Sequence, residues 1–183
     1  MFILSIGHHP DAKGATNGDY NEFDLACQWA ERIEQILGPK DIGFKLAPVG
    51  RLEDKVKFIN NTRHVQFAAE LHFNANITGA QGSETLYYPG SNSGRKYANM
   101  IQNEYERRNI FQPNRGAKEG YYFNSDGTKS DEILYFLRAT KVPSVIIEPE
   151  FMSNMDRIND YWYEGCDAII QATLKFHRYL NHE

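Results

Sequence analysis

The chain has 183 residues, 41% of them hydrophobic, which is enough to bury one sizeable core and indicates a single domain. Lys and Arg total 20 against 24 Asp and Glu residues, and the net charge of −4 gives no electrostatic basis for binding nucleic acid or an anionic membrane surface. We therefore expect a soluble surface of mixed charge.

The first residues form a short apolar run. Residues 2–7 lead directly into His8 and His9, have no basic flank, and are too few for the apolar region of a signal peptide. We predict a buried strand here. No other stretch approaches the roughly 18 apolar residues that span a bilayer, so we expect cytoplasmic synthesis, initial retention in the cytoplasm and no membrane insertion.

The rest of the chain alternates short apolar runs with longer segments of helical period. This alternation predicts an α/β fold: a single-domain, open, mostly parallel twisted sheet of about six strands with helices on both faces. Further strands are expected at 43–48, 67–73, 83–88 and 144–148. Besides the first helix, helices are expected at 52–63, 93–108, 130–138 and 158–180.

The first helix is expected to begin near Asp19. Asp19 and Glu22 have the spacing of an N-cap residue and a third-position carboxylate, which together form a capping box. Apolar residues at helical spacing follow as far as Leu37, and Gly38-Pro39 ends the pattern.

Residues 112–129 form the longest stretch without a clear period. They are rich in Gly, Asn and Lys and contain the pair Tyr121-Tyr122. Long loops inside compact domains are often functional, so we expect a loop here in which the two tyrosines line a groove or stack on a ligand.

Metal-binding residue types stand at three places where a predicted strand ends or a helix begins. These are His8-His9, Glu22 and His72. Open α/β sheets place their sites at the carboxyl ends of their strands. Two imidazoles and one carboxylate form the three-ligand set of zinc hydrolases, which leave a fourth position for water. Glu148 ends the apolar strand 144–148 and is positioned to move a proton from the nucleophile to a departing amine.

Each of these residues also has a purely structural interpretation. His8 or His72 taken alone is typical of a hydrogen-bonded structural histidine, and Glu22 can complete a capping box at the positive end of the helix dipole. Glu148 is equally placed for an ion pair with an arginine. The spacings are too long for a local motif of the His-Glu-x-x-His kind, so the residue types alone leave both interpretations open.

A series of short motifs along nearly the whole chain points to one family. In chain order they are Gly7-His8, Gly14-Ala15, Glu22, Leu71-His72-Phe73-Asn74-Ala75, Gly82-Ser83-Glu84-Thr85, Asn114-Arg115-Gly116 and Ile147-Glu148-Pro149-Glu150-Phe151-Met152-Ser153-Asn154. This order resembles the zinc-dependent N-acetylmuramoyl-L-alanine amidases of bacterial autolysins and phage endolysins. The resemblance implies one catalytic Zn2+ ion held by His8, Glu22 and His72, with Glu148 as the catalytic carboxylate.

The chain departs from the family pattern at two places. Where the family usually has two glycines after the first histidine, this chain has His9-Pro10, which stiffens the loop and adds a second imidazole. Either His8 or His9 can therefore be the ligand, and the alignment with the Gly-His pair favours His8. Glu150 replaces a glycine before Phe151, which is expected to add bulk and charge close to Glu148.

Two polar residues flank His72 on the same face of the predicted strand. Glu70 is expected either to orient the metal ligand from behind or to form a simple ion pair. Asn74 is expected to bind substrate or to support the metal ligands.

The other histidines and the cysteines are assigned no chemistry. We expect His64, His177 and His182 to have surface or packing roles. Cys27 and Cys166 lie far apart without CxxC spacing, which argues against a disulfide framework and indicates buried structural thiols.

The resemblance implies hydrolysis of the amide bond between N-acetylmuramic acid and L-alanine in peptidoglycan. We expect a monomeric catalytic domain over residues 1–183, with no separate cell-wall-binding domain. Lack of a signal sequence suggests a cell-lysis endolysin that reaches the wall after release. The alternatives are a bacterial enzyme exported by another route and one that acts inside a lysed mother cell.

Two other functions remain open. The first is a zinc peptidase that cuts the stem peptides of peptidoglycan, against which the Arg115-Gly116 and 151–154 motifs favour the amidase. The second is a wall-binding module without catalysis. The presence of all four candidate residues, His8, Glu22, His72 and Glu148, argues against that alternative.

Overall fold

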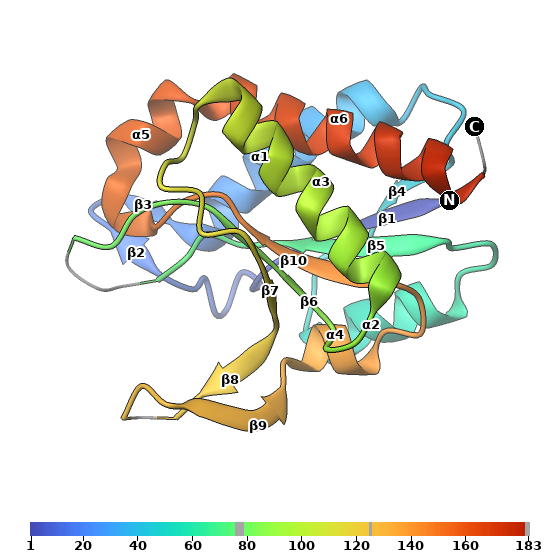
Figure 1. The fold of residues 1–183 in the computed structure, drawn as a ribbon, viewed down its shortest axis with the longest axis horizontal. Helices are drawn as coiled ribbons and strands as arrows, with labels where there is room; N and C mark the ends of the chain where they lie inside the picture. The colour runs from blue at the N-terminus through green and yellow to red at the C-terminus, as the bar shows by residue number, and fades with distance from the viewer. Residues whose placement is uncertain (76–78, 125, 182–183) are drawn as a thin grey trace.

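The centre of the molecule is a six-stranded sheet with the strand order β4-β1-β5-β10-β6-β7 (Figure 1). The computed structural model describes residues 1–75, 79–124 and 126–181. The strands of this sheet are β1 (Phe2–Ile6), β4 (Phe44–Leu46), β5 (Phe67–Leu71), β6 (Glu84–Tyr87), β7 (Ala117–Glu119) and β10 (Ser144–Glu148). Strands β4, β1, β5 and β10 are parallel, whereas β6 pairs antiparallel with β10 and parallel with β7. The mostly parallel sheet predicted from the sequence is confirmed.

Helices cover both faces of this sheet (Figure 1). The helices α1 (Glu22–Leu37), α3 (Asn92–Arg108) and α6 (Trp162–Leu180) lie on one face, and α2 (Leu52–Asn61) and α4 (Tyr135–Ala139) lie on the other. The alternation of side chains along β1 divides the core accordingly. Leu4 packs with the larger cluster under α1, α3 and α6, whereas Ile3 packs with the smaller cluster under α2 and α4.

Two small hairpins and a short helical segment complete the chain. The hairpin of β2 (Thr16–Asn17) and β3 (Tyr20–Asn21) leads into α1, and the hairpin of β8 (Tyr121–Phe123) and β9 (Lys129–Ile133) projects from the edge of the sheet (Figure 1). A 3-10 turn, η1 (Met152–Asn154), and α5 (Met155–Asp160) connect β10 to α6. No helix within the described ranges is long and apolar enough to cross a membrane.

The predicted N-cap of the first helix is wrong by two residues. Asp19 lies in the turn of the β2–β3 hairpin, and the helix is capped by Asn21, whose side chain accepts a hydrogen bond from the Asp24 amide at 2.9 Å. Because the hairpin continues to Asn21, Glu22 becomes the first helical residue instead of the third. A capping box at Asp19 and Glu22 is therefore not formed, and the Glu22 side chain is available for other contacts.

The region between residues 112 and 139 also differs from its prediction. The presumed loop contains β7 and β8, and the first part of the helix predicted at 130–138 is β9. Ile133, Phe136 and Leu137 have helical spacing, but Ile133 ends the strand and packs against the same core cluster as the other two. The helical spacing of these apolar residues thus comes from the last residue of a strand followed by a short helix.

The helix predicted at 158–180 begins earlier and is interrupted. Tyr161 separates α5 from α6 with φ −109° and ψ 21°, outside helical geometry. Its ring lies edge-on to the buried Phe111, with 5.7 Å between the ring centroids. This aromatic contact fixes the position of Tyr161 between the two helices. Cys166 in α6 is buried and Cys27 in α1 is half-buried, and both are free thiols.

Candidate active site

The four candidate residues meet at the carboxyl edge of the sheet. His8 follows β1, His72 follows β5, and Glu148 is the last residue of β10. Since β1, β5 and β10 are parallel neighbours, their carboxyl ends lie side by side. Glu22 reaches the same place from the first turn of α1, which is the region where open α/β sheets place their ligands.

His8, Glu22 and His72 form a cluster that could hold a metal ion. One ligand atom from each residue lies within 4.8 Å of the others. The Nε2 atom of His8 is 2.9 Å from one oxygen of Glu22, and Nδ1 of His72 is 2.9 Å from the other oxygen. His9 is outside this cluster, and its Nδ1 atom lies 3.9 Å from Asp11. The geometry therefore favours His8 over His9.

The backbone around this cluster lets the three side chains pack closely against it. His8 has a φ of 62°, in the left-handed region that costs a non-glycine residue free energy and is common at functional sites. A Cβ atom on Gly7 would lie 2.6 Å from the His72 ring, and one on Gly14 would lie 2.5 Å from the Glu22 carboxylate. Glycine at these two positions leaves the space that the His72 and Glu22 side chains fill.

Glu22 is a buried carboxylate with four polar contacts. Its exposed fraction is 3%, and besides the two imidazoles it accepts hydrogen bonds from the amides of Ala15 and Phe73, both at 3.1 Å. Burial acts to raise the pKa of Glu22, but the hydrogen bonds and charges of His72 and His8 outweigh it and lower the pKa to about 2. Glu22 is therefore ionised at neutral pH.

Glu148 has the opposite electrostatic character. Burial raises its pKa to about 8, and the negative charges of Glu22, Glu84 and Glu70 act in the same direction, while His72 opposes them. Its Oε2 atom is buried and has no hydrogen-bond partner among the described residues. A carboxyl group with a free oxygen and a pKa near neutrality is suited to accept and return a proton.

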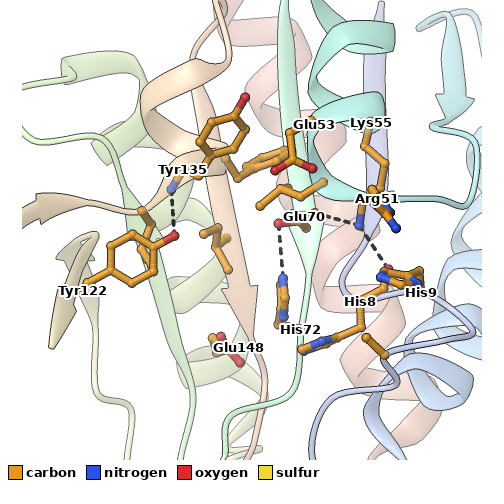
Figure 2. Close-up of a pocket in the computed structure, with 15 residues that line it drawn as sticks. His8, His9, Arg51, Glu53, Lys55, Glu70, His72, Tyr122, Tyr135 and Glu148 are labelled. Carbon is orange, nitrogen blue, oxygen red and sulfur yellow. Dashed lines mark hydrogen bonds and ion pairs between the residues drawn. The ribbon is translucent and has the colours of Figure 1, made fainter. Parts of the chain in front are cut away.

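A cavity of about 630 Å³ opens beside these residues and contains His8, His72 and Glu148 in its lining. Figure 2 shows His72 between His8 on one side and Glu148 on the other. The cavity runs over the sheet face between α2 and α4, and Tyr122 of β8 forms part of its wall.

Tyr122 contacts α4, because the Tyr135 amide donates a hydrogen bond to its hydroxyl at 3.4 Å (Figure 2). The expectation that Tyr122 lines a groove agrees with this position, whereas Tyr121 is not among the lining residues.

Sequence reasoning missed two cations in this cavity. Arg51 caps α2 and is exposed at the cavity wall, whereas Lys55, one turn further along, is only 2% exposed. A signal for Lys55 was present, because it lies at helical spacing with Leu52, Val56 and Ile59 and so falls within the apolar stripe. A lysine on the buried face of a helix needs a specific partner.

The remaining flanking residues have clear partners. Glu70 is 2% exposed and lies 3.2 Å from both Lys55 Nζ and His72 Nε2. Asn74 donates to the side chain of Glu84 at 2.7 Å, and Glu84 is the residue opposite Glu148 in the register of β6 and β10.

The side chain of Glu150 is directed away from the cavity. It accepts hydrogen bonds from the Gly82 and Phe151 amides and forms an ion pair with Arg157 at 3.1 Å. The expected extra charge beside Glu148 is thus neutralised within the adjoining loop.

His64 is exposed and His177 is half-buried on α6, as surface or packing roles require. His182 lies outside the described residues.

Known proteins share this fold and sequence pattern. The family model described as N-acetylmuramoyl-L-alanine amidase matches residues 3–162. The amidase AmiC2 of Nostoc punctiforme superposes with a TM-score of 0.79 at 21% identity, over 96% of both chains. An N-acetylmuramoyl-L-alanine amidase from Clostridium difficile 630 gives a TM-score of 0.78 at 22% identity, over 96% of this chain and 95% of that one.

A further solved structure is somewhat closer in sequence. The catalytic domain of the CD27L endolysin targeting Clostridia difficile gives a TM-score of 0.73 at 26% identity, over 95% of this chain and 96% of that one. None of the curated protein sequences matches this chain. The extent of the family match shows that the chain belongs to the N-acetylmuramoyl-L-alanine amidase family, and its function is that of a peptidoglycan amidase.

Proposed function

We propose that this amidase is zinc-dependent and cuts the bond between N-acetylmuramic acid and L-alanine, with His8, Glu22 and His72 as the zinc ligands. The observation that carries the proposal is the convergence of these three side chains within 4.8 Å. Two imidazole nitrogens and one carboxylate are the ligand set of catalytic zinc sites that keep an open position. The ionised state of Glu22 fits this role, because a ligating carboxylate must be deprotonated.

Glu148 is assigned the proton transfers. Zinc bound at the site supplies Lewis acidity and lowers the pKa of water to about 7. The free Oε2 atom of Glu148 accepts the proton of the attacking water and passes it to the nitrogen of the departing L-alanine. Glu148 lines the same cavity as His8 and His72, which places its carboxyl group beside the proposed ion for both steps.

The biological role proposed here is that of a monomeric cell-lysis endolysin, made in the cytoplasm and acting on the wall after release. The likeness to an endolysin catalytic domain at 26% identity supports this role. Two experiments test this role. Sedimentation of the purified protein measures its oligomeric state, and cells with and without expression of the protein are compared for wall lysis after their membrane is permeabilised. A dimer in solution, or lysis without permeabilisation, would contradict it.

Mass spectrometry of digested peptidoglycan tests the reaction. We expect release of intact stem peptides with a free L-alanine amine, leaving unsubstituted glycan, and we expect a zinc chelator to stop it and added zinc to restore it. Shortened stem peptides would instead identify a zinc peptidase. Binding to several wall types without any product would identify a wall-binding module.

A further inference from the structure

A buried lysine lies behind the candidate metal ligands. Lys55 of α2 is 2% exposed, and its ammonium group has an acceptor for each of its three protons. It donates to the backbone carbonyls of Ile6 at 2.5 Å and His8 at 3.2 Å, and it lies 3.2 Å from Oε1 of Glu70. These contacts tie α2 to the carboxyl end of β1 and to β5.

Glu70 extends these contacts to the second histidine. Its Oε1 atom also accepts a hydrogen bond from the Ser5 hydroxyl at 3.1 Å, and its Oε2 atom lies 3.2 Å from Nε2 of His72 (Figure 2). With the Nε2 proton directed at Glu70, Nδ1 is the ring nitrogen that faces Glu22. Lys55 and Glu70 therefore connect the backbone of His8 with the ring of His72.

We propose that Lys55 and Glu70 are positioning residues for the metal centre: Glu70 sets the orientation and tautomer of His72, and Lys55 fixes both Glu70 and the backbone of His8. This inference rests on the proposed zinc site. Partners that accept the second ring proton of a metal-ligating histidine fix its tautomer, and their loss lowers metal affinity 10- to 100-fold.

The backbone of His8 gives Lys55 a second role. His8 has a left-handed φ of 62°, a conformation that surrounding contacts must hold in place. Its carbonyl accepts from Lys55, and its imidazole contacts Glu22 at 2.9 Å. The hydrogen bond from Lys55 holds this residue in the conformation in which its ring reaches the cluster.

A simple structural ion pair is the competing interpretation, and a double variant separates the two. Removing one partner of a buried pair leaves an uncompensated charge and is strongly destabilising, whereas replacing both partners by apolar residues of similar size is far less costly. Lys55→Met, Glu70→Met and the double variant are compared with Lys57→Met. This control makes the same change on the exposed face of α2.

Zinc affinity is measured by competition with a chelator, and the absorption spectrum of the Co2+-substituted protein reports ligand geometry. We expect the double variant to recover unfolding free energy relative to the single variants. We also expect it to bind zinc 10- to 100-fold more weakly than the wild type and to have an altered cobalt spectrum. Lys57→Met should match the wild type in both measurements.

A folded double variant with zinc affinity within twofold of the wild type and an unchanged cobalt spectrum would overturn the inference and leave a structural ion pair. Failure of the wild-type protein itself to bind zinc would instead contradict the proposed function. The two failures are therefore distinguishable.

Discussion

At the scale of single residues, Glu148 and Glu22 show how the environment gives two carboxylates different properties. Glu22 has a pKa of about 2 because two imidazoles and two backbone amides stabilise its charge, and burial alone does not prevent ionisation. Glu148 is half-buried near three other carboxylates, its Oε2 atom is buried without a hydrogen-bond partner among the described residues, and it has a pKa of about 8. The two groups are thus suited to metal binding and to proton transfer, respectively.

Replacement of Glu148 tests this division. Glu148→Gln keeps the size of the side chain but removes the proton acceptor, so we expect zinc content and thermal stability to remain near wild type while kcat falls by about 100-fold or more. Metal analysis, thermal unfolding and product release from peptidoglycan measure the three quantities. Glu34→Gln, an exposed change on α1, is the control, and near-normal activity in Glu148→Gln would remove Glu148 from the mechanism.

Gly14 provides a steric test of the candidate ligand cluster. Its φ is +78°, and an added Cβ would lie 2.5 Å from the Glu22 carboxylate and 2.6 Å from the His8 ring. We expect Gly14→Ala to weaken zinc binding at least about tenfold, because the ligands must move apart. Gly18→Ala is a matched control, since Gly18 has a φ of +58° but no atom within 4 Å of the added Cβ. Equal zinc affinity in the two variants, whether reduced or unchanged, would contradict displacement of the ligands by the added Cβ.

How far the candidate site could be predicted differs from residue to residue. His8, Glu22, His72 and Glu148 were identified from residue type and position at predicted strand ends and a helix start, and the structure brings the first three into one cluster. Lys55 was missed because a lysine in an amphipathic helix is normally assigned to the solvent face. Its role depends on acceptors from β1 and β5, which local spacing does not reveal.

At the scale of elements, a buried carboxylate joins α3 to α6. Glu104 of α3 is 2% exposed and pairs with Arg107 and Arg108 on its own helix and with Lys175 of α6. Burial acts to raise the pKa of Glu104, but the hydrogen bonds with Lys175 and the two arginines outweigh it and lower the pKa to about 2. The ionised form is therefore favoured in the folded state.

Because the pKa of Glu104 is depressed on folding, its contribution to stability is present above the unfolded pKa of about 4.5 and is lost as the pH falls toward 2. We expect Glu104→Gln to lower the free energy of unfolding by about 1–3 kcal/mol at pH 7. The difference from the wild type should shrink between pH 4.5 and 2. Urea unfolding at several pH values measures this, with Glu106→Gln as the exposed control on the same helix. A difference that is constant with pH would contradict the assignment.

The sequence mispredicted those helices and strands whose position depends on strand pairing rather than on the local pattern of apolar residues. The strands β1, β5 and β10 were placed correctly from apolar runs, since fully buried parallel strands carry a strong local signal. In contrast, β9 is polar and β8 consists of three successive aromatic residues, and both strands are largely exposed, so neither shows the alternation of a half-buried strand. The position of Glu22 was also misjudged, because a two-residue strand ending at Asn21 determines where α1 starts.

At the scale of the whole molecule, the candidate metal cluster connects three separate parts of the fold. His8 and His72 follow neighbouring strands of the sheet, and Glu22 begins the helix that covers one face. An ion bound here would be bound by the folded state and not by the unfolded chain. Metal binding should therefore increase global stability.

Thermal unfolding with and without zinc tests this coupling. At a free zinc concentration 100 times the Kd, binding adds about 2.7 kcal/mol, which corresponds to an increase in Tm of about 5–10 °C for a domain of this size. His72→Ala should show no such increase and should lose activity. An equal zinc-dependent shift in His72→Ala would mean that the ion binds elsewhere.

The order of these residues along the chain has a consequence for how the family can diversify. All three candidate ligands lie within the first 72 residues, whereas Glu148 comes from β10, later in the chain. In the proposed mechanism the three ligands hold the ion and Glu148 moves the proton, so metal binding and bond cleavage should be separable by mutation. A descendant that changed only at Glu148 would then keep the candidate ligand cluster and the cavity beside it. On this proposal a single substitution, rather than a new fold, would convert a wall-cutting enzyme into a protein that only binds the wall.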